Sequence, residues 1–238
     1  MSYTASACFS APMARHAEVV MARLDGDAHA VRSESGLLSD AELERASRFA
    51  REGDRGRFIL GRATLRRLLG SRLRIPPRAV DLVVGPHGKP ALAPQLQRSG
   101  LQFNVSHCAQ VAAFGFAWGR GIGVDVEAVR PIPDADSIAR QFFSPLEVQA
   151  YFALPAPDRP LGFFNCWTRK EAFVKARGEG LGFGLARFDV SLAPGGPARI
   201  LRVDQERGES CGWVLGEFNP APGFVGAVVV QSEMGRLQ

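Results

Sequence analysis

The chain has 238 residues, of which 46% are hydrophobic and 22% charged, and it carries a formal net charge of +5. This composition is typical of an ordinary globular protein with one large or two modest domains, and it excludes collagen-like, coiled-coil and intrinsically disordered proteins. The four cysteines lack CxxC spacing, and there is neither a signal-peptide pattern nor a run of ~18 apolar residues, so we expect a cytoplasmic protein with no membrane association.

Helix signals precede strand signals in the first half of the chain. The segment LSDAEL starts a helix, because Ser39 can cap the backbone N–H groups and Glu42 can return the bond in a capping box. Four elements are predicted, in this order: a helix that starts within residues 38–43, a second helix over 57–69 that ends at Gly70, a strand over 80–84 followed by a turn at 85–88, and an apolar strand over 111–118.

The second half repeats this order 105 to 113 residues later. Its predicted elements are a helix start at 143–148, a helix over 163–176 that ends at Gly178, a strand over 188–192 with a turn at 194–197, and an apolar strand over 224–231. The sequence therefore predicts two similar α+β halves, residues 1–119 and 120–238. A ligand site is expected at the seam, because clefts between domains are favoured binding sites.

Basic charge is concentrated in the first half. Residues 1–119 carry 16 basic and 10 acidic side chains, whereas residues 120–238 carry 13 and 14. Residues 45–78 alone hold 11 arginines and two acidic residues. This arginine cluster is either a solvated face or a surface for phosphates, nucleic acid or an acidic protein, so a nucleic-acid-binding module is one candidate function.

Two carboxylates lie at the seam, in the segment GIGVDVE. In a strand, Asp125 and Glu127 project from the same face, while Ile122, Val124 and Val126 point into the core. Adjacent carboxylates repel each other unless a cation lies between them, and Mg²⁺ prefers one or two carboxylates together with substrate phosphates. The segment indicates either a magnesium site, which would also suit a phosphohydrolase, or a polar edge strand paired with arginines.

All three lysines of the chain lie in motifs. In WTRKEAFVK, Glu171 and Lys175 share a face of the predicted helix, either as a surface ion pair or as a carboxylate and a phosphate-binding cation. Lys170 points to another face and stays unassigned. The turn GKP presents Lys89, and NVSH places His107 before an apolar strand, where a histidine is either a structural or a ligand-binding residue.

These motifs together resemble one family. NVSH, GVDVE, FFSPLE and WTRKEAFVKARGEGL, in this order and at these spacings, are similar to the Sfp-type 4′-phosphopantetheinyl transferases. HGKP and FARE add to the resemblance, which covers roughly residues 38–192. The resemblance implies an α+β fold of two similar halves related by pseudo-twofold symmetry, an active site at their seam, and a chain that works as a monomer.

The resemblance also implies an activity. This is Mg²⁺-dependent transfer of 4′-phosphopantetheine from coenzyme A to a serine of an acyl, peptidyl or aryl carrier protein, with release of 3′,5′-ADP and no nucleic-acid partner. The implied roles are metal ligation by Asp125, Glu127 and Glu171, general-base catalysis by Glu171, catalysis by Lys175 at phosphate oxygens, and coenzyme A binding by Arg48, Arg51, Lys89, Ser106, His107 and Lys175. Phe58 stands where at least some relatives have a polar residue near the nucleotide, which leaves the contacts of that helix open.

Overall fold

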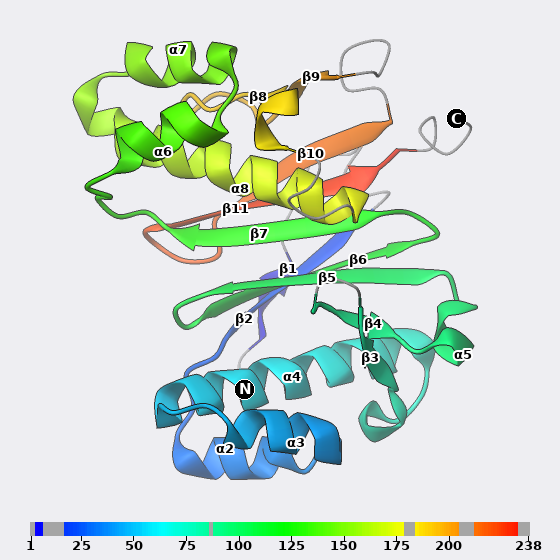
Figure 1. The fold of residues 1–238 in the computed structure, drawn as a ribbon. Coiled ribbons are helices and arrows are strands. Elements are labelled where there is room, and N and C mark those ends of the chain that lie inside the picture. The colour runs from blue at the N-terminus through cyan, green and yellow to red at the C-terminus, as the bar shows by residue number, and fades with distance from the viewer. Residues whose placement is uncertain (1–2, 7–16, 86–87, 179–183, 205–211, 233–238) are drawn as a thin grey trace.

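Two sheets lie back to back between two groups of helices (Figure 1). The computed structural model describes residues 3–6, 17–85, 88–178, 184–204 and 212–232. Up to residue 118 the elements are β1 (Tyr3–Ser6), β2 (Glu18–Arg23), α2 (Ala28–Ser35), α3 (Asp40–Ser47), α4 (Glu52–Leu73), η1 (Pro77–Ala79), β3 (Leu82–Val84), β4 (Pro90–Leu92), α5 (Pro94–Gln97), β5 (Leu101–Cys108) and β6 (Val111–Trp118). After it come β7 (Ile122–Ala128), α6 (Ala135–Phe142), α7 (Pro145–Ala153), η2 (Ala156–Asp158), α8 (Arg159–Arg177), η4 (Leu185–Arg187), β8 (Phe188–Val190), β9 (Ile200–Val203), β10 (Trp213–Phe218) and β11 (Phe224–Gln231).

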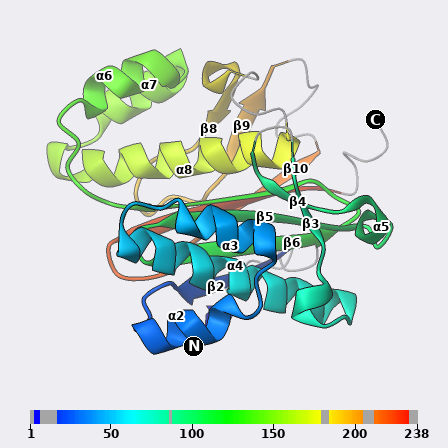
Figure 2. The ribbon, with the colours of Figure 1, turned by 60° about the horizontal axis from the view of Figure 1, so that its bottom comes forward.

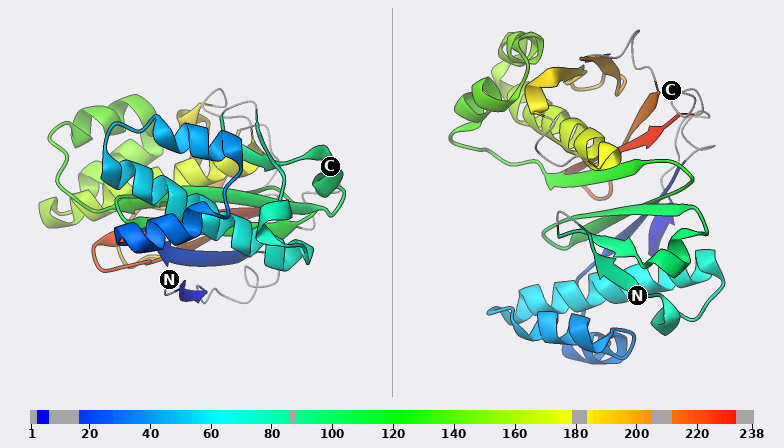
Figure 3. Two further views of the ribbon diagram at one scale, coloured as in Figure 1. Left: turned by 90° about the horizontal axis from the view of Figure 1, so that it is seen from below. Right: turned by 45° about the vertical axis from the view of Figure 1, so that its right-hand side comes forward.

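Both main sheets are antiparallel and use a similar strand order. The first is β1-β2-β6-β5, and the second is β10-β11-β7. In each sheet the last strand of its half, β6 or β11, pairs with both the first and the second long strand of that half. The long helix of each half, α4 or α8, covers the outer face of its own sheet, as the turned views show (Figures 2 and 3). The predicted mixed α+β fold is confirmed.

Apolar side chains fill the space between the two sheets. Val19 and Ala113 from the first sheet pack with Val124 and Val228 from the second. The sheets approach closely at Gly115, where a Cβ atom would lie 2.6 Å from the Val124 side chain. Since inward side chains alternate along a strand, the outer faces remain free to pack on the helices, and each sheet is thereby buried on both sides.

Several local predictions are confirmed. The helix that follows Ser39 has the capping box with Glu42, and α7 has the equivalent box between Ser144 and Glu147. Strands β6 and β11 span the predicted residues 111–118 and 224–231. Gly178 ends α8 in the left-handed conformation, with φ of 75°. Short-range rules work at these positions because the required partners lie within four residues.

The prediction that Gly70 ends the second helix is wrong. The helix continues to Leu73, and Arg74 is the left-handed C-cap, with φ of 56°. Gly70 is buried within the helix, where a Cβ atom would lie 2.8 Å from the Ile75 carbonyl oxygen and 3.2 Å from Pro77. The glycine therefore allows the chain that leaves the helix to fold back against it.

The other predicted elements are present, but their ends differ. The helices predicted over 57–69 and 163–176 begin earlier, at Glu52 and Arg159. The strand predicted over 80–84 starts at Leu82, and the strand predicted over 188–192 ends at Val190. Residues 86–87 of the predicted turn, and residues 179–181 at the end of the long motif, lie outside the described residues. Within the described part of the chain, no helix has the length and apolar character needed to cross a membrane.

Candidate active site

The neighbouring edges of the two sheets meet at β5 and β7. The Asn104 side-chain oxygen on β5 accepts the backbone N–H of Val124 on β7, at 3.0 Å. Ser106 and Asp125 lie beside this link on the same two strands, and the Ser106 hydroxyl donates to Asp125 Oδ1 at 2.8 Å. A carboxylate from the second half is thus positioned by side chains from the first.

Two glycines bring α8 directly onto β7. A Cβ atom on Gly123 would lie 2.1 Å from the Ala172 carbonyl oxygen, and one on Gly121 would lie 2.6 Å from the Ala176 carbonyl oxygen. No larger residue fits there, so the helix backbone lies on the strand itself. The same strand face continues to Asp125, and the helix therefore carries Lys175 next to that carboxylate.

Lys175, Asp125 and Ser106 form one compact cluster. Lys175 Nζ lies 2.6 Å from Asp125 Oδ1, and it also donates to Ser106 Oγ at 3.3 Å and to the Val124 carbonyl oxygen at 3.2 Å. The Lys175 and Asp125 side chains are only 14% and 7% exposed. The second carboxylate oxygen, Asp125 Oδ2, is buried without a hydrogen-bond partner among the described residues. An anionic oxygen left in this way favours a bound cation.

Glu171 and Lys89 lie close enough to this cluster to be perturbed by it. Burial raises the pKa of Glu171 above its ordinary value; Lys175 opposes this shift, and repulsion from Asp125 reinforces it. Burial lowers the pKa of Lys89, and repulsion from Lys175 adds to the effect. Charged groups from the β3–β4 turn, β7 and α8 therefore share one partly desolvated region.

Glu127 has partners of its own. It accepts a hydrogen bond from the Cys108 thiol at 3.4 Å and lies 3.7 Å from Arg130. Asp125 and Glu127 project from the α8 side of β7, as the alternation predicts, and Val124 and Val126 are buried between the sheets. Across the residues that the structure describes, no three His, Cys, Asp or Glu side chains converge on a preformed metal centre.

A hollow of about 440 Å³ adjoins the cluster and is named here the α4 hollow. Lys89 and His107 line one part of it, and Arg45, Phe58 and Arg62 line another. The guanidinium carbons of Arg45 and Arg62 lie 5.3 and 5.7 Å from the centre of the Phe58 ring. Two of the predicted coenzyme A ligands therefore lie together, beside arginines that the sequence did not single out.

Arg62 is the most enclosed of these cations. Its side chain is 11% exposed and lies 3.5 Å from Glu42 Oε1, an oxygen without a hydrogen-bond partner among the described residues. Burial lowers the pKa of Arg62, and attraction to Glu42 opposes this. The aromatic ring of Phe58 and a partly compensated guanidinium suit a flat base and an anion, respectively.

The other two predicted coenzyme A ligands do not line the α4 hollow. Arg48 caps the C-terminus of α3 and pairs with Glu44 on an exposed surface. Arg51 is the N-cap residue of α4. Arg48 and Arg51 do not share a helix, because the chain leaves the helical conformation between them.

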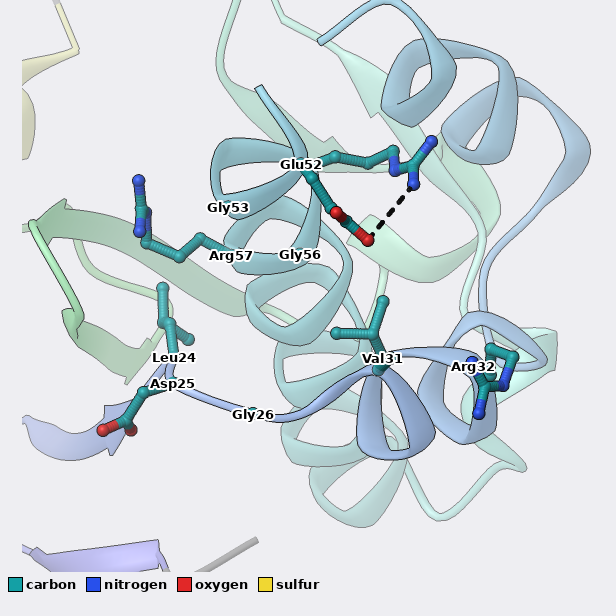
Figure 4. Close-up of a pocket in the computed structure, with 11 residues that line it drawn as sticks. Leu24, Asp25, Gly26, Val31, Arg32, Glu52, Gly53, Gly56 and Arg57 are labelled. Carbon is teal, nitrogen blue, oxygen red and sulfur yellow. Dashed lines mark ion pairs between the residues drawn. The ribbon is translucent and has the colours of Figure 1, made fainter. Parts of the chain in front are cut away.

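A second hollow, of about 520 Å³, lies between α2 and the start of α4 (Figure 4). It shares Leu24 and Arg57 with the α4 hollow. Two of the three arginines that line it have acidic neighbours on the same helix: Arg57 pairs with Asp54 at 2.5 Å, and Arg55 with Glu52 at 3.9 Å. Since the charges of Arg55 and Arg57 are balanced by these neighbours, the second hollow offers less free positive charge than its three arginines alone would give.

Several arginines of the cluster pair with glutamates from other segments of the chain. Arg66 is buried, bonds to Glu42 at 2.7 Å, and donates to the backbone after α4, including the Val80 carbonyl oxygen. Further pairs are Arg67 with Glu34 and Arg72 with Glu18. These glutamates come from outside residues 45–78, so the high local charge of the sequence does not become one basic face. This distribution counts against the nucleic-acid alternative.

Sequence patterns did not identify the residues that bring the site together. Asn104 occurs within NVSH and Gly123 within GVDVE, but only the packing of β5 and α8 on β7 shows their roles. Arg45 and Arg62 lie on different helices and meet only across Phe58. A local pattern contains no signal for a contact of this kind.

Comparison with known proteins agrees with this geometry. Residues 121–229 match the model of the 4′-phosphopantetheinyl transferase superfamily, and residues 28–115 match that of a 4′-phosphopantetheinyl transferase N-terminal region. The chain is 37% identical over 196 residues to the 4′-phosphopantetheinyl transferase HetI of Nostoc sp., covering 82% of this chain and 79% of that protein. It is 29% identical to Sfp of Bacillus subtilis, over 69% of this chain and 70% of that protein, and 34% identical to AcpT of Salmonella typhi, over 66% and 75%.

These similarities define the class of protein. The chain belongs to the 4′-phosphopantetheinyl transferase superfamily and is an enzyme of that class. The matched regions include β5, β7 and α8, which together carry the cluster of Ser106, Asp125 and Lys175.

Proposed function

We propose that this enzyme transfers 4′-phosphopantetheine from coenzyme A to a serine hydroxyl of an acyl, peptidyl or aryl carrier protein. The serine oxygen forms a bond to the β-phosphorus of coenzyme A, the bond from that phosphorus to the bridging oxygen breaks, and 3′,5′-ADP leaves. The observation that carries the proposal is the buried cluster of Asp125, Ser106 and Lys175 beside a hollow lined by cations. The two halves would then be a pseudo-twofold pair with the active site at their seam, which the similar strand orders support.

Asp125, Glu127 and Glu171 would hold Mg²⁺. The unpartnered Asp125 Oδ2 supports this assignment. The pKa of Glu171 supports it too, because burial raises this pKa and repulsion from Asp125 and Glu127 raises it further. The bound ion would neutralise charge on the diphosphate as it develops. Glu171, whose raised pKa makes it a stronger base than an ordinary glutamate, would take the proton of the carrier serine directly or through water.

The remaining cations would bind the nucleotide. Lys175 would meet diphosphate oxygens at the cluster, where a compact ammonium serves as a point charge. Lys89 and His107 line the α4 hollow, and we add Arg45 and Arg62 to the proposed coenzyme A ligands because they line it too. Arg48 and Arg51 stay predictions for the 3′-phosphate, and Ser106 stays a prediction for the diphosphate.

The decisive experiment incubates the enzyme with coenzyme A, Mg²⁺ and a panel of apo-carrier proteins from fatty-acid, polyketide, nonribosomal-peptide and siderophore synthesis. Intact-mass measurement should show one phosphopantetheine added per carrier, with an equal amount of 3′,5′-ADP. The Asp125→Asn variant should lose this activity and keep its fold. Carriers left unmodified across the whole panel would refute the proposal, and cleavage of coenzyme A without any carrier would favour the phosphohydrolase alternative.

Two further expectations accompany the activity. A monomer is expected, and light scattering during gel filtration measures it. A cytoplasmic location is expected from the cysteine usage, and cell fractionation tests it.

A further inference from the structure

Lys175 is held by protein groups alone. Its ammonium has three partners at hydrogen-bond distance: Asp125 Oδ1, Ser106 Oγ and the Val124 carbonyl oxygen. The two oxygens of the Asp125 carboxylate therefore differ in their partners. Oδ1 is fully engaged by Lys175 and Ser106, and Oδ2 is buried without a partner among the described residues. The protein supplies its own counter-ion to the carboxylate that a divalent cation would use.

Two cations at one carboxylate compete. The Lys175 ammonium lies 2.6 Å from the Asp125 carboxylate, so a divalent ion bound at that carboxylate would repel it. The ammonium in turn weakens the attraction of the carboxylate for the ion. The competition ends only if the ammonium gains another anion nearby, and a diphosphate provides one. The partial burial of both side chains makes the competition stronger than it would be on an open surface.

We propose that Lys175 is an internal counter-ion that couples divalent-cation binding to coenzyme A binding: it suppresses metal binding at Asp125 until the diphosphate draws the ammonium away. This inference rests on the proposed function, since it takes the diphosphate to be that of coenzyme A. Metal and coenzyme A then strengthen each other's binding by the same factor, as linkage requires. Lys175 in this role is a positioning residue, in addition to its contact with phosphate.

Lys89 provides a matched control of equal charge. It interacts electrostatically with Glu171 and Asp125, so its removal also makes the region more negative. Both Lys89 and Asp125 lie in the described part of the chain, and no hydrogen bond or ion pair joins them there. The comparison of Lys175→Met with Lys89→Met therefore separates loss of the contact from loss of one positive charge.

The test measures metal binding without turnover. The full-length wild type and both variants are titrated with Mn²⁺, which accepts the same oxygen ligands as Mg²⁺, and the free ion is counted by electron paramagnetic resonance. Mg²⁺ added afterwards should displace the bound ion. Without coenzyme A, we expect Lys175→Met to bind Mn²⁺ about tenfold more tightly than wild type, a difference of ~1.4 kcal/mol, and Lys89→Met to differ much less.

The same Mn²⁺ titrations are then repeated with coenzyme A. It should tighten Mn²⁺ binding by the wild type strongly and by Lys175→Met only weakly, because the competing ammonium is already gone. Equal Mn²⁺ affinities for Lys175→Met and Lys89→Met, or equal coenzyme A effects in wild type and Lys175→Met, would overturn the inference. Either result leaves the outcome of the carrier assay unaffected. Failure of the carrier assay would refute the proposed function, but the comparison of Mn²⁺ affinities without coenzyme A could still be interpreted.

Discussion

Lys170 and Glu147 form a buried ion pair between α8 and α7. Lys170 Nζ lies 2.7 Å from Glu147 Oε2, and the two side chains are 1% and 2% exposed. Lys170 also donates to the carbonyl oxygens of Leu185 and Phe188, and Glu147 accepts the backbone N–H of Val190 at 2.7 Å. The pair therefore joins two helices to the β8 segment, and we assign Lys170 a structural role.

Lys170→Met should lower stability strongly, because it leaves the Glu147 carboxylate buried without its counter-ion. Removing one partner of a buried pair costs about 3–5 kcal/mol. For a chain of this size, that corresponds to a fall in Tm of roughly 6–20 °C. Lys175→Met is the matched control on the same helix. Its loss should be clearly smaller, since Lys175 is 14% exposed and Asp125 keeps the hydrogen bond from Ser106.

The deficit of Lys170→Met should depend on pH. Burial raises the pKa of Glu147 and Lys170 opposes the shift, so without Lys170 this pKa rises further. A raised pKa in the folded state gives stability that is present at low pH and lost as pH rises through that pKa. Calorimetry at pH 5 to 8 should therefore show a deficit that grows with pH. Adding Glu147→Gln should recover part of the loss. An unchanged Tm, or equal losses in Lys170→Met and Lys175→Met, would refute the reasoning.

Three further outcomes are expected. Gly123→Ala should destabilise the protein and abolish transfer, since its Cβ would lie 2.1 Å from a carbonyl oxygen of α8. Gly53→Ala, whose Cβ would have no neighbour nearer than 3.6 Å, should leave Tm and the transfer rate near wild type. Equal effects of the two variants in calorimetry and rate assays would contradict the packing argument. Glu171→Gln should cut kcat about 100-fold or more yet raise Tm at pH 7 in chelator-treated protein, because it removes a desolvated charge with a raised pKa; a lower Tm would indicate a structural role instead. Arg62→Ala should raise KM for coenzyme A several-fold while Arg55→Ala, which lines only the second hollow, should not; steady-state kinetics giving equal KM values would place the nucleotide elsewhere.

The arginine cluster shows where a reading of local charge fails. Residues 45–78 have 11 arginines and two acidic residues, which predicted either a solvated basic face or a surface for phosphates, nucleic acid or an acidic protein. In the fold, Arg66, Arg67 and Arg72 pair with glutamates from other segments of the chain. A count along the sequence cannot include these partners, because they approach only when α2, α3 and β2 pack around α4.

The sequence by itself determined the local elements and the residues able to do chemistry. Capping boxes, the alternation in β7 and the i,i+4 spacing of Glu171 and Lys175 involve near neighbours in the chain, so they could be predicted from residue type alone. The motifs also identified the family correctly. Short-range interactions fix these features whatever the rest of the chain does.

Only the tertiary structure decided how those residues meet. Lys175 and Ser106 are 69 residues apart in the chain, and their contact depends on the link from Asn104 to β7 and on the glycines that admit α8. The same packing gave Arg62 its place in the α4 hollow and buried Lys170 away from it. Long-range contacts are set by the shapes and faces of whole elements, and a contact between distant residues therefore emerges only when the elements that carry them are packed together.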